Sequence, residues 1–555
     1  MPVKKISLIF SLVVFSVLLC VIMVSCSGHE HSLVFRQPKE ATCASEGNVG
    51  YWVCEKCDMY FSDIGGNKQI EDKDSVIIPM TDHTFGDRLK YDKETHYYLC
   101  LVCGGKKDEA PHTFNDIFIC TGCGYTEFYE GFTFSSESGG VYITGTDLTG
   151  EITIPGTYRD MPVIGIAPGA FSGNRDITAV TIENGIYEIG ASAFEGCVNL
   201  KSVVWPESVR LIGEKAFKGS GLTSLTLTGN LINVGSEAFS SCSELVSLTV
   251  SDGVESIAPQ AFRDCTALKE ISFPQGLKSI GDSAFRGCGA IESVSLPGSL
   301  TEIGSYAFAA TGIKNLDLEG SGLAIGASAF RDCLWLDGVV IGEGVITIGD
   351  EAFSGCLGLG DLTIGGDVTE IGQNAFRNCV ELLKLEIPVN VIKIGYGAFS
   401  NCNKITEAVV PFVGSRLSDT ENSHFGYIFG AAAYNDNSRY VPSALKKVTV
   451  LAGGGINASS FRGCNNITEV VICDGIGVIG GNSFSGCASL SKITIPSSVT
   501  DIGYKALADC GSLTEIVYGG TAEEWEAVSK GIDWDENTGD YKIECAGSVL
   551  DKEII

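Results

Sequence analysis

Between about residues 165 and 510, apolar and polar positions repeat with a short and nearly constant period. The segment from Leu268 to Cys288, LKEISFPQGLKSIGDSAFRGC, aligns without a gap with the segment from Leu490 to Cys510, LSKITIPSSVTDIGYKALADC. Aligning all copies on the position that most of them fill with Cys gives fourteen copies. Ten of the thirteen spacings between them are 23 residues, two are 22 and one is 62. The pattern therefore predicts fourteen coils of a solenoid, with an insertion in one of them.

Within each coil, the pattern predicts one short strand and one tight corner. Ile271-Ser272-Phe273 alternates apolar and polar side chains as a strand does, and Pro274 ends the strand because it lacks a backbone donor. One strand per coil predicts a parallel sheet along the solenoid. Eleven of the fourteen coils carry Gly four residues before the Phe position, which indicates a positive φ or a close backbone approach at that corner.

Two further positions of the coil predict its interior. Thirteen of the 27 Phe residues stand at one position, from Phe171 to Phe484, and we interpret them as a stacked core spine. The Cys position accepts Ser220 and Thr311 without a change of period, so we interpret its cysteines as small, reduced core residues and not as disulfides.

The pattern of Leu, two variable residues, alternating apolar residues and Pro, followed by Ile-Gly and Ala-Phe-x-x-Cys, resembles the BspA-like leucine-rich repeats of bacterial surface proteins. The resemblance implies a right-handed leucine-rich-repeat solenoid with a parallel β-sheet face, mostly β and irregular in structure. It divides the chain into an N-terminal strand cap at 129–168, the solenoid at 169–515 and a C-terminal cap at 516–555. In the last segment, Thr521 and Glu524 form a capping-box pattern before Trp525.

The insertion, at about 411–445, is rich in aromatic residues and resembles a loop inserted in the same family. We expect these aromatics to be exposed and to contact a partner, since large aromatic side chains are favoured at interface hot spots. The candidate partner-binding residues are Phe412, Phe425, Tyr427 and Phe429.

The first residues have the pattern of an export signal. Lys4 and Lys5 precede an apolar run that ends before Ser25-Cys26-Ser27, and small residues before a Cys resemble the lipobox of bacterial lipoproteins. We therefore predict a lipoprotein signal peptide at 1–25 and lipidation of Cys26, which anchors the chain to the membrane outside the cytoplasm. An uncleaved membrane helix is the alternative.

Residues 26–128 form a Cys/His-rich module with metal-ligand spacing. Three Cys-x-x-Cys pairs lie there with five of the six His residues of the chain. A structural zinc ion is the preferred interpretation, and disulfides are the alternative because export permits them. The 16 residues between Cys103 and Cys120 suit a zinc ribbon, whereas an alternative grouping places each pair between two histidines. The candidate ligands are Cys54, Cys57, Cys100, Cys103, Cys120, Cys123, His31, His83 and His112.

Charge and missing motifs limit the function. With 68 acidic against 38 basic residues, the formal charge of -30 disfavours nucleic acid. We find no catalytic motif, so we expect no enzyme and no small-molecule substrate. Members of the resembled family act as adhesins, which implies a cell-surface protein that binds an extracellular protein or glycan. A structural or self-associating surface-layer protein is the alternative.

Overall fold

The computed structural model describes residues 25–26, 29–85, 90–91, 95–101, 103–113, 121–122, 131–137, 140–159, 161–417, 421–452 and 455–552. The chain divides into two compact units, Met1–Glu127 and Phe128–Ile555. The predicted signal peptide lies outside the described residues except for Ser25. Among the described residues, no helix has the length and apolar character needed to cross a membrane.

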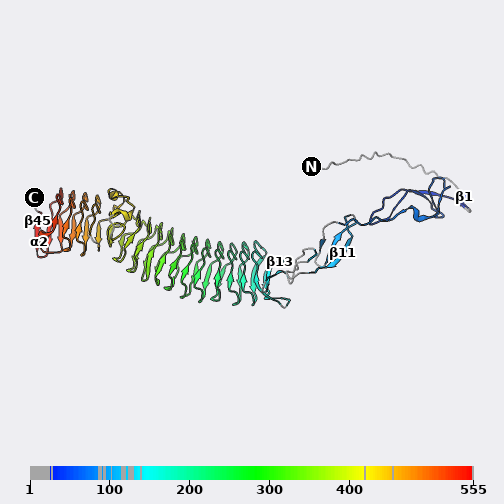
Figure 1. The fold of residues 1–555 in the computed structure, drawn as a ribbon, viewed down its shortest axis with the longest axis horizontal. Helices are drawn as coiled ribbons and strands as arrows, with labels where there is room; N and C mark the ends of the chain where they lie inside the picture. Colours follow the sequence, from blue (N-terminus) through cyan, green and yellow to red (C-terminus); the bar gives the residue numbers. More distant parts are fainter. Residues whose placement is uncertain are drawn as a thin grey trace. The chain divides into compact units, whose positions relative to one another are not determined.

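The second unit is the predicted solenoid, built of about 17 turns with two walls of parallel strands (Figure 1). Its turns outnumber the fourteen sequence repeats for two reasons. The strand ladder continues into the flanking segments at Gly150–Ile154 and Lys542–Cys545, and the insertion adds a strand of its own at Lys447–Val450. The strands of the first wall are β14 (Gly150–Ile154), β17 (Ile177–Ile182), β19 (Ser202–Val204), β21 (Ser224–Leu227), β23 (Ser247–Val250), β25 (Glu270–Ser272), β28 (Asn315–Leu318), β30 (Gly338–Ile341), β32 (Asp361–Ile364), β34 (Lys384–Glu386), β36 (Glu407–Val410), β37 (Lys447–Val450), β38 (Glu469–Ile472), β40 (Lys492–Ile495), β42 (Glu515–Tyr518) and β44 (Lys542–Cys545).

The second wall consists of shorter strands, which pair in parallel with the equivalent strands of neighbouring coils. They are β16 (Met161–Ile166), β18 (Glu188–Ile189), β20 (Leu211–Ile212), β22 (Asn233–Val234), β24 (Ser256–Ile257), β26 (Ser279–Ile280), β27 (Glu302–Ile303), β29 (Leu323–Ile325), β31 (Val345–Ile348), β33 (Glu370–Ile371), β35 (Lys393–Ile394), β39 (Val478–Ile479), β41 (Asp501–Ile502) and β43 (Ser529–Lys530).

The core between the walls contains the Phe spine that the sequence predicts. From Phe194 to Phe399, rings of successive coils lie 5.0–5.5 Å apart between centroids, with interplanar angles of 2–11°. Each ring in this run is fully buried. The Gly corner, for which the sequence left two explanations, is a close approach: a Cβ on Gly281 would lie 2.7 Å from the Pro259 nitrogen, and its φ is not in the left-handed region.

The insertion between β36 and β37 contains the 3-10 helices η2 (Phe425–Phe429) and η3 (Tyr434–Asp436) and the helical turn α1 (Asn437–Tyr440). The first wall continues without interruption, since β36 pairs directly with β37. Along the Phe spine, η2 stands where a regular coil has its Ala-Phe segment. Phe399 N donates to Ile428 O at 2.8 Å, and Phe425 N donates to Ser460 O at 2.7 Å.

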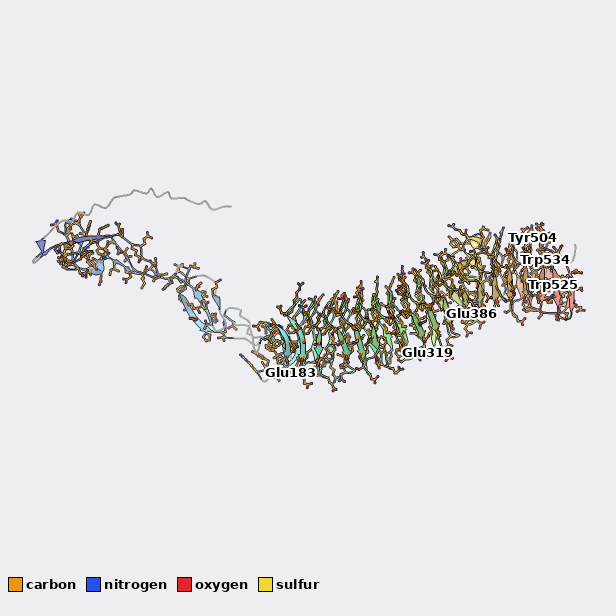
Figure 2. All side chains as sticks on the ribbon, turned by 180° about the vertical axis from the view of Figure 1, so that it is seen from behind. Glu183, Glu319, Glu386, Tyr504, Trp525 and Trp534 are labelled. Carbon is orange, nitrogen blue, oxygen red and sulfur yellow. The ribbon has the colours of Figure 1, made fainter. Side chains whose placement is uncertain are left out.

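Both ends of the solenoid are covered. The hairpin of β12 (Phe132–Glu137) and β13 (Gly140–Thr146) pairs with β16 at one end, beside β15 (Thr157–Tyr158). At the other end, helix α2 (Ala522–Ala527) has the predicted capping box of Thr521 and Glu524, and β45 (Ser548–Asp551) pairs antiparallel with β44. Figure 2 shows Tyr504, Trp525 and Trp534 gathered at this end.

The first unit is built of short antiparallel strands. One sheet contains β3 (Leu33–Arg36), β5 (Tyr51–Cys54), β6 (Tyr60–Phe61) and β7 (Gln69–Ile70), and another contains β9 (Lys90–Tyr91), β10 (Thr95–Leu99) and β11 (Lys106–Pro111). Two smaller pairs are β1 (Ser25–Cys26) with β2 (His29–Glu30), and β4 (Gly47–Asn48) with β8 (Ile77–Ile78). The 3-10 helix η1 (Lys73–Val76) precedes β8.

Candidate functional site

Four potential metal ligands converge in the first unit, where the ligand atoms of Cys43, His83, Cys100 and Cys103 all lie within 4.8 Å of one another. Cys43 Sγ is 3.5 Å from Cys100 Sγ, and His83 Nδ1 is 3.4 Å from Cys103 Sγ. Cys43 and Cys100 are buried, and burial raises the pKa of the Cys43 thiol to about 11. A cation at this position would favour the thiolate that ordinary burial disfavours.

A second group contains His31, Cys54 and Cys57, again with ligand atoms within 4.8 Å. His31 Nδ1 lies 3.4 Å from Cys57 Sγ, and both His31 and Cys54 are buried. The ring of His31 also packs against Phe61, with 5.1 Å between centroids. The module therefore contains two Cys/His clusters that could hold a metal.

The two Cys-x-x-Cys turns have the same backbone geometry. The N–H of the first Cys donates to the carbonyl five residues on, from Cys54 to Met59 and from Cys100 to Gly105. The fourth residue after the first Cys is left-handed in both turns, with φ of 56° at Asp58 and 72° at Gly104. Each turn thus holds its two sulfur atoms toward one point.

Six of the nine sequence-predicted ligands fall in the two clusters, and Cys43 is a further ligand candidate that the sequence interpretation missed. The predicted ligand His112 is in neither of the clusters found among the described residues. Cys43 was not among the candidates because it stands alone, outside any Cys-x-x-Cys pair. The rings of His96 and His112 are 5.5 Å apart. Cys120 and Cys123 lie outside the described residues, and the side chain of Cys26 is not described either.

The expected exposure of the insertion aromatics is wrong. Phe412, Phe425 and Phe429 are 4%, 1% and 1% exposed, and Tyr427 is half-buried. Phe425 packs on Phe461 of the spine at 4.8 Å between centroids. The aromatics of the insertion serve the core, because the insertion must replace the rings that a regular coil would supply.

The outward side chains of the first wall form regular rows across the coils. In the amino-terminal coils the row members are mostly Ser and Thr, such as Ser224, Thr226 and Thr249. In the carboxyl-terminal coils, Lys and Glu alternate from strand to strand, and several neighbours form ion pairs. The pairs are Lys384–Glu407 at 3.8 Å, Lys447–Glu469 at 3.3 Å and Lys492–Glu515 at 2.7 Å. The opposite charges balance within this face.

An apolar patch, defined here as Leu334, Trp335 and Leu357, lies on two successive coils just after the Cys position. Their exposed fractions are 49%, 70% and 44%. Gly358, which occupies the position of Trp335 in the next coil, adds no side chain beside the indole. Most other coils carry small or polar residues here, so the sequence signal was the Cys-Leu-Trp-Leu run at 333–336.

His424 and most of the repeat cysteines of the solenoid have structural partners. His424 is buried, and its Nε2 lies 3.0 Å from the Ala431 carbonyl oxygen. The repeat cysteines are free thiols, as expected, and most of their Sγ atoms donate to carbonyl oxygens, as from Cys197 to Phe171 at 3.1 Å. Burial raises the pKa of Cys197 to about 11 and that of Cys510 to about 12, so these thiols stay protonated.

Parallel strands in short coils, a ring spine and capped ends define a leucine-rich-repeat solenoid, which is a scaffold for binding. The chain matches the BspA type leucine rich repeat region over residues 164–262, 233–360, 323–427 and 454–527. It therefore belongs to the BspA-type leucine-rich-repeat family, whose members are typically exposed on cell surfaces and bind proteins or glycans.

Several solved structures are similar in fold. A leucine-rich repeat protein from Bacteroides ovatus is 24% identical, covers 67% of this chain and 95% of its own, and has a TM-score of 0.41. A leucine rich cell surface protein from Faecalibacterium prausnitzii is 24% identical, with 72% and 97% covered and a TM-score of 0.34. The pneumococcal vaccine antigen PcpA is 16% identical, with 75% and 97% covered and a TM-score of 0.36. No curated protein matches the chain.

Proposed function

We propose that this chain is a non-enzymatic cell-surface adhesion or recognition protein that binds an extracellular protein or glycan through its solenoid. The apolar patch carries the proposal. Exposed Trp side chains are rare on soluble scaffolds and are enriched in interface hot spots, and Trp335 is 70% exposed beside two exposed leucines. Leu334 and Leu357 extend the apolar surface beside the indole, which suits the apolar centre of a protein interface.

The test is a binding screen with the immobilised chain, using extracellular-matrix proteins, a glycan array and a second copy of the chain as probes. Trp335→Ser should weaken the binding that the screen finds at least tenfold, which corresponds to about 1.4 kcal/mol. Ile232→Ser is the matched control, since Ile232 is also 70% exposed but lies outside the patch. Equal losses in both variants, or none in Trp335→Ser, would remove the patch from the binding site.

Binding only to a second copy would favour the structural, self-associating alternative. The covered ends of the solenoid argue against end-to-end stacking, since β45 and the β12–β13 hairpin occupy the edges that a neighbour would extend. Binding only to a second copy would therefore indicate self-association through a lateral face of the solenoid.

We further propose that the chain is exported and held at the membrane by lipid on Cys26. The apolar run before Cys26 and the membership of a surface-exposed family support this. Metabolic labelling with palmitate should label the chain, and Cys26→Ala should remove both the label and membrane retention. Retention without label would favour the uncleaved helix.

The first unit is proposed to contain structural zinc, held by ligands among Cys54, Cys57, Cys100, Cys103, Cys120, Cys123, His31, His83 and His112. Support comes from the two clusters, whose mixed Cys and His composition suits tetrahedral zinc. Disulfides alone would not use the histidines, and they would leave one of the three thiols of the Cys43 cluster unpaired within it. Elemental analysis of the purified chain measures the metal directly.

A further inference from the structure

The geometry points to a closed Cys₃His zinc site formed by Cys43, His83, Cys100 and Cys103, in which the ion ties two successive segments of the chain together. This inference rests on the proposed zinc content and adds Cys43 as a ligand. It also assigns Cys43 to the later Cys-x-x-Cys pair, although Cys54-x-x-Cys57 lies only eleven residues away in the sequence.

The separations fit one tetrahedral ion. Bonds of about 2.3 Å to sulfur and about 2.0 Å to nitrogen place neighbouring ligand atoms about 3.5–3.8 Å apart. The observed 3.5 Å between the Cys43 and Cys100 sulfurs, and 3.4 Å between His83 Nδ1 and the Cys103 sulfur, lie close to this range. A disulfide would need about 2.0 Å between sulfurs, and three thiols cannot all pair.

The backbone explains why Cys43 meets His83. Cys43 precedes β4 and His83 follows β8, and these strands pair antiparallel with Gly47 opposite Ile78. Thr81 N donates to Thr42 O at 3.2 Å just outside the pair. The two ligands therefore stand at the ends of one closed loop.

A backbone hydrogen bond of the same kind holds the Cys-x-x-Cys turn beside the His in both clusters. The N–H of the residue after the first Cys donates to the carbonyl oxygen of the residue after the His, from Leu101 to Thr84 at 2.9 Å and from Glu55 to Ser32 at 3.1 Å. Gly105 N also donates to Cys103 Sγ at 3.4 Å, a contact that stabilises a metal-bound thiolate. His83 and the Cys100 turn are thus placed as a unit, to which Cys43 supplies the fourth ligand.

The loop from Cys43 to His83 contains Cys54 and Cys57 of the other cluster, whereas His31 precedes it. An ion at the Cys43 site therefore closes the loop that contains the two cysteines of the His31 cluster. We expect the metal at the Cys43 site to hold residues 43–103 together as one cross-linked segment, whose loop opens when that ion leaves.

The experiment measures zinc per chain in the purified full-length protein and in three variants. Cys43→Ser should contain one zinc equivalent less than the wild type. Cys43→His should keep that equivalent, because imidazole is also a zinc ligand. The control Cys197→Ser, which changes a buried solenoid thiol outside the module, should leave the zinc content unchanged.

A second measurement needs no variant. In the zinc-loaded wild type, Cys43, Cys100 and Cys103 should be protected from alkylation together and become reactive together on chelation. Zinc in the wild type that Cys43→Ser retains in full, or a Cys43 that reacts while Cys100 stays protected, would overturn the inference and leave the zinc proposal standing. A wild type without zinc and with oxidised thiols would overturn both.

Discussion

Two positions of each coil have a left-handed backbone, and the sequence favours Gly, Asn or Asp at only one of them. The position before the Cys has positive φ at Gly219 (66°), Asp264 (60°) and Ala310 (58°), and it is filled mostly by Gly, Asn and Asp. The position two residues after the Gly corner has positive φ at Ser283 (56°) and Tyr306 (57°), among ordinary residues. Each such non-Gly residue costs stability because its Cβ crowds the backbone.

The two directions of this effect can be tested at one position of the coil. Gly219→Ala should lower the free energy of unfolding by about 1–2 kcal/mol, because its left-handed backbone then carries a Cβ. No heavy atom lies within 4 Å of the added Cβ, so a packing clash would not account for the loss. Ala310→Gly, the reciprocal change, should cost nothing or stabilise. Urea unfolding of both variants decides this, and a destabilised Ala310→Gly would contradict it.

The Cys position supplies a hydrogen-bond donor as well as a small core side chain. Cys288 Sγ donates to Phe262 O at 3.1 Å, and Thr311 Oγ1 at the same position donates to Phe308 O at 2.9 Å. The carbonyl of Phe262 also accepts from Cys265 N, so the thiol is its second donor.

Thr and Val are nearly isosteric, so two substitutions at Cys288 separate these roles. Cys288→Thr should be more stable than Cys288→Val by about 1 kcal/mol, since only Thr keeps a donor. Apolar burial alone predicts the opposite order. Thermal or urea unfolding of the two variants is the measurement, and a Val variant of equal or greater stability would reduce the Cys position to packing alone.

The insertion acts as a substitute coil and not as a loose loop. Phe425 lies on Phe461 in the spine, Phe399 donates to η2, and Asn437 is fully buried with its side chain bonded to Gly426 N and Ser460 O. Without η2, the ring of Phe461 would lose Phe425 as its neighbour.

Phe425→Ala should therefore lower the stability of the solenoid by about 3–5 kcal/mol, as for a buried core Phe. Tyr434→Ala, in the same insertion but 39% exposed, is the matched control and should cost less than about 1 kcal/mol. Hydrogen exchange should show the loss first in the coils on either side of the insertion. Equal and small effects would mean that the insertion is dispensable to the spine.

The two units should respond differently to the removal of metal. Each coil of a solenoid is stabilised by its neighbours and needs no ion, whereas a small Cys/His module depends on its metal. Chelation should unfold residues 29–113 and leave the melting of the solenoid unchanged, as followed by hydrogen exchange of the full chain. Solenoid coils that unfold with the module would contradict the independence of the two units.

The regular parts of the solenoid could be predicted from the sequence because their residue pattern repeats. The Phe spine, the parallel strands and the helix cap at Thr521 follow from side chains that recur at one position or act within a few residues, so the same local pattern reports the same geometry each time. Trp335 could also have been found from the sequence, because it interrupts the small or polar residues that most coils carry after the Cys position.

The partner of Cys43, the burial of Phe425 and the left-handed backbone at Ser283 depend on contacts between segments that are distant along the chain. Cys43 meets His83 because β4 pairs with β8, and Phe425 is buried because a gap in the spine had to be filled. Ser283 is held left-handed by the neighbouring coil, since its N–H donates to Ser305 O at 2.7 Å. Periodicity along the chain therefore determined the solenoid, while proximity in the folded chain decided where its irregular parts and its ligands lie.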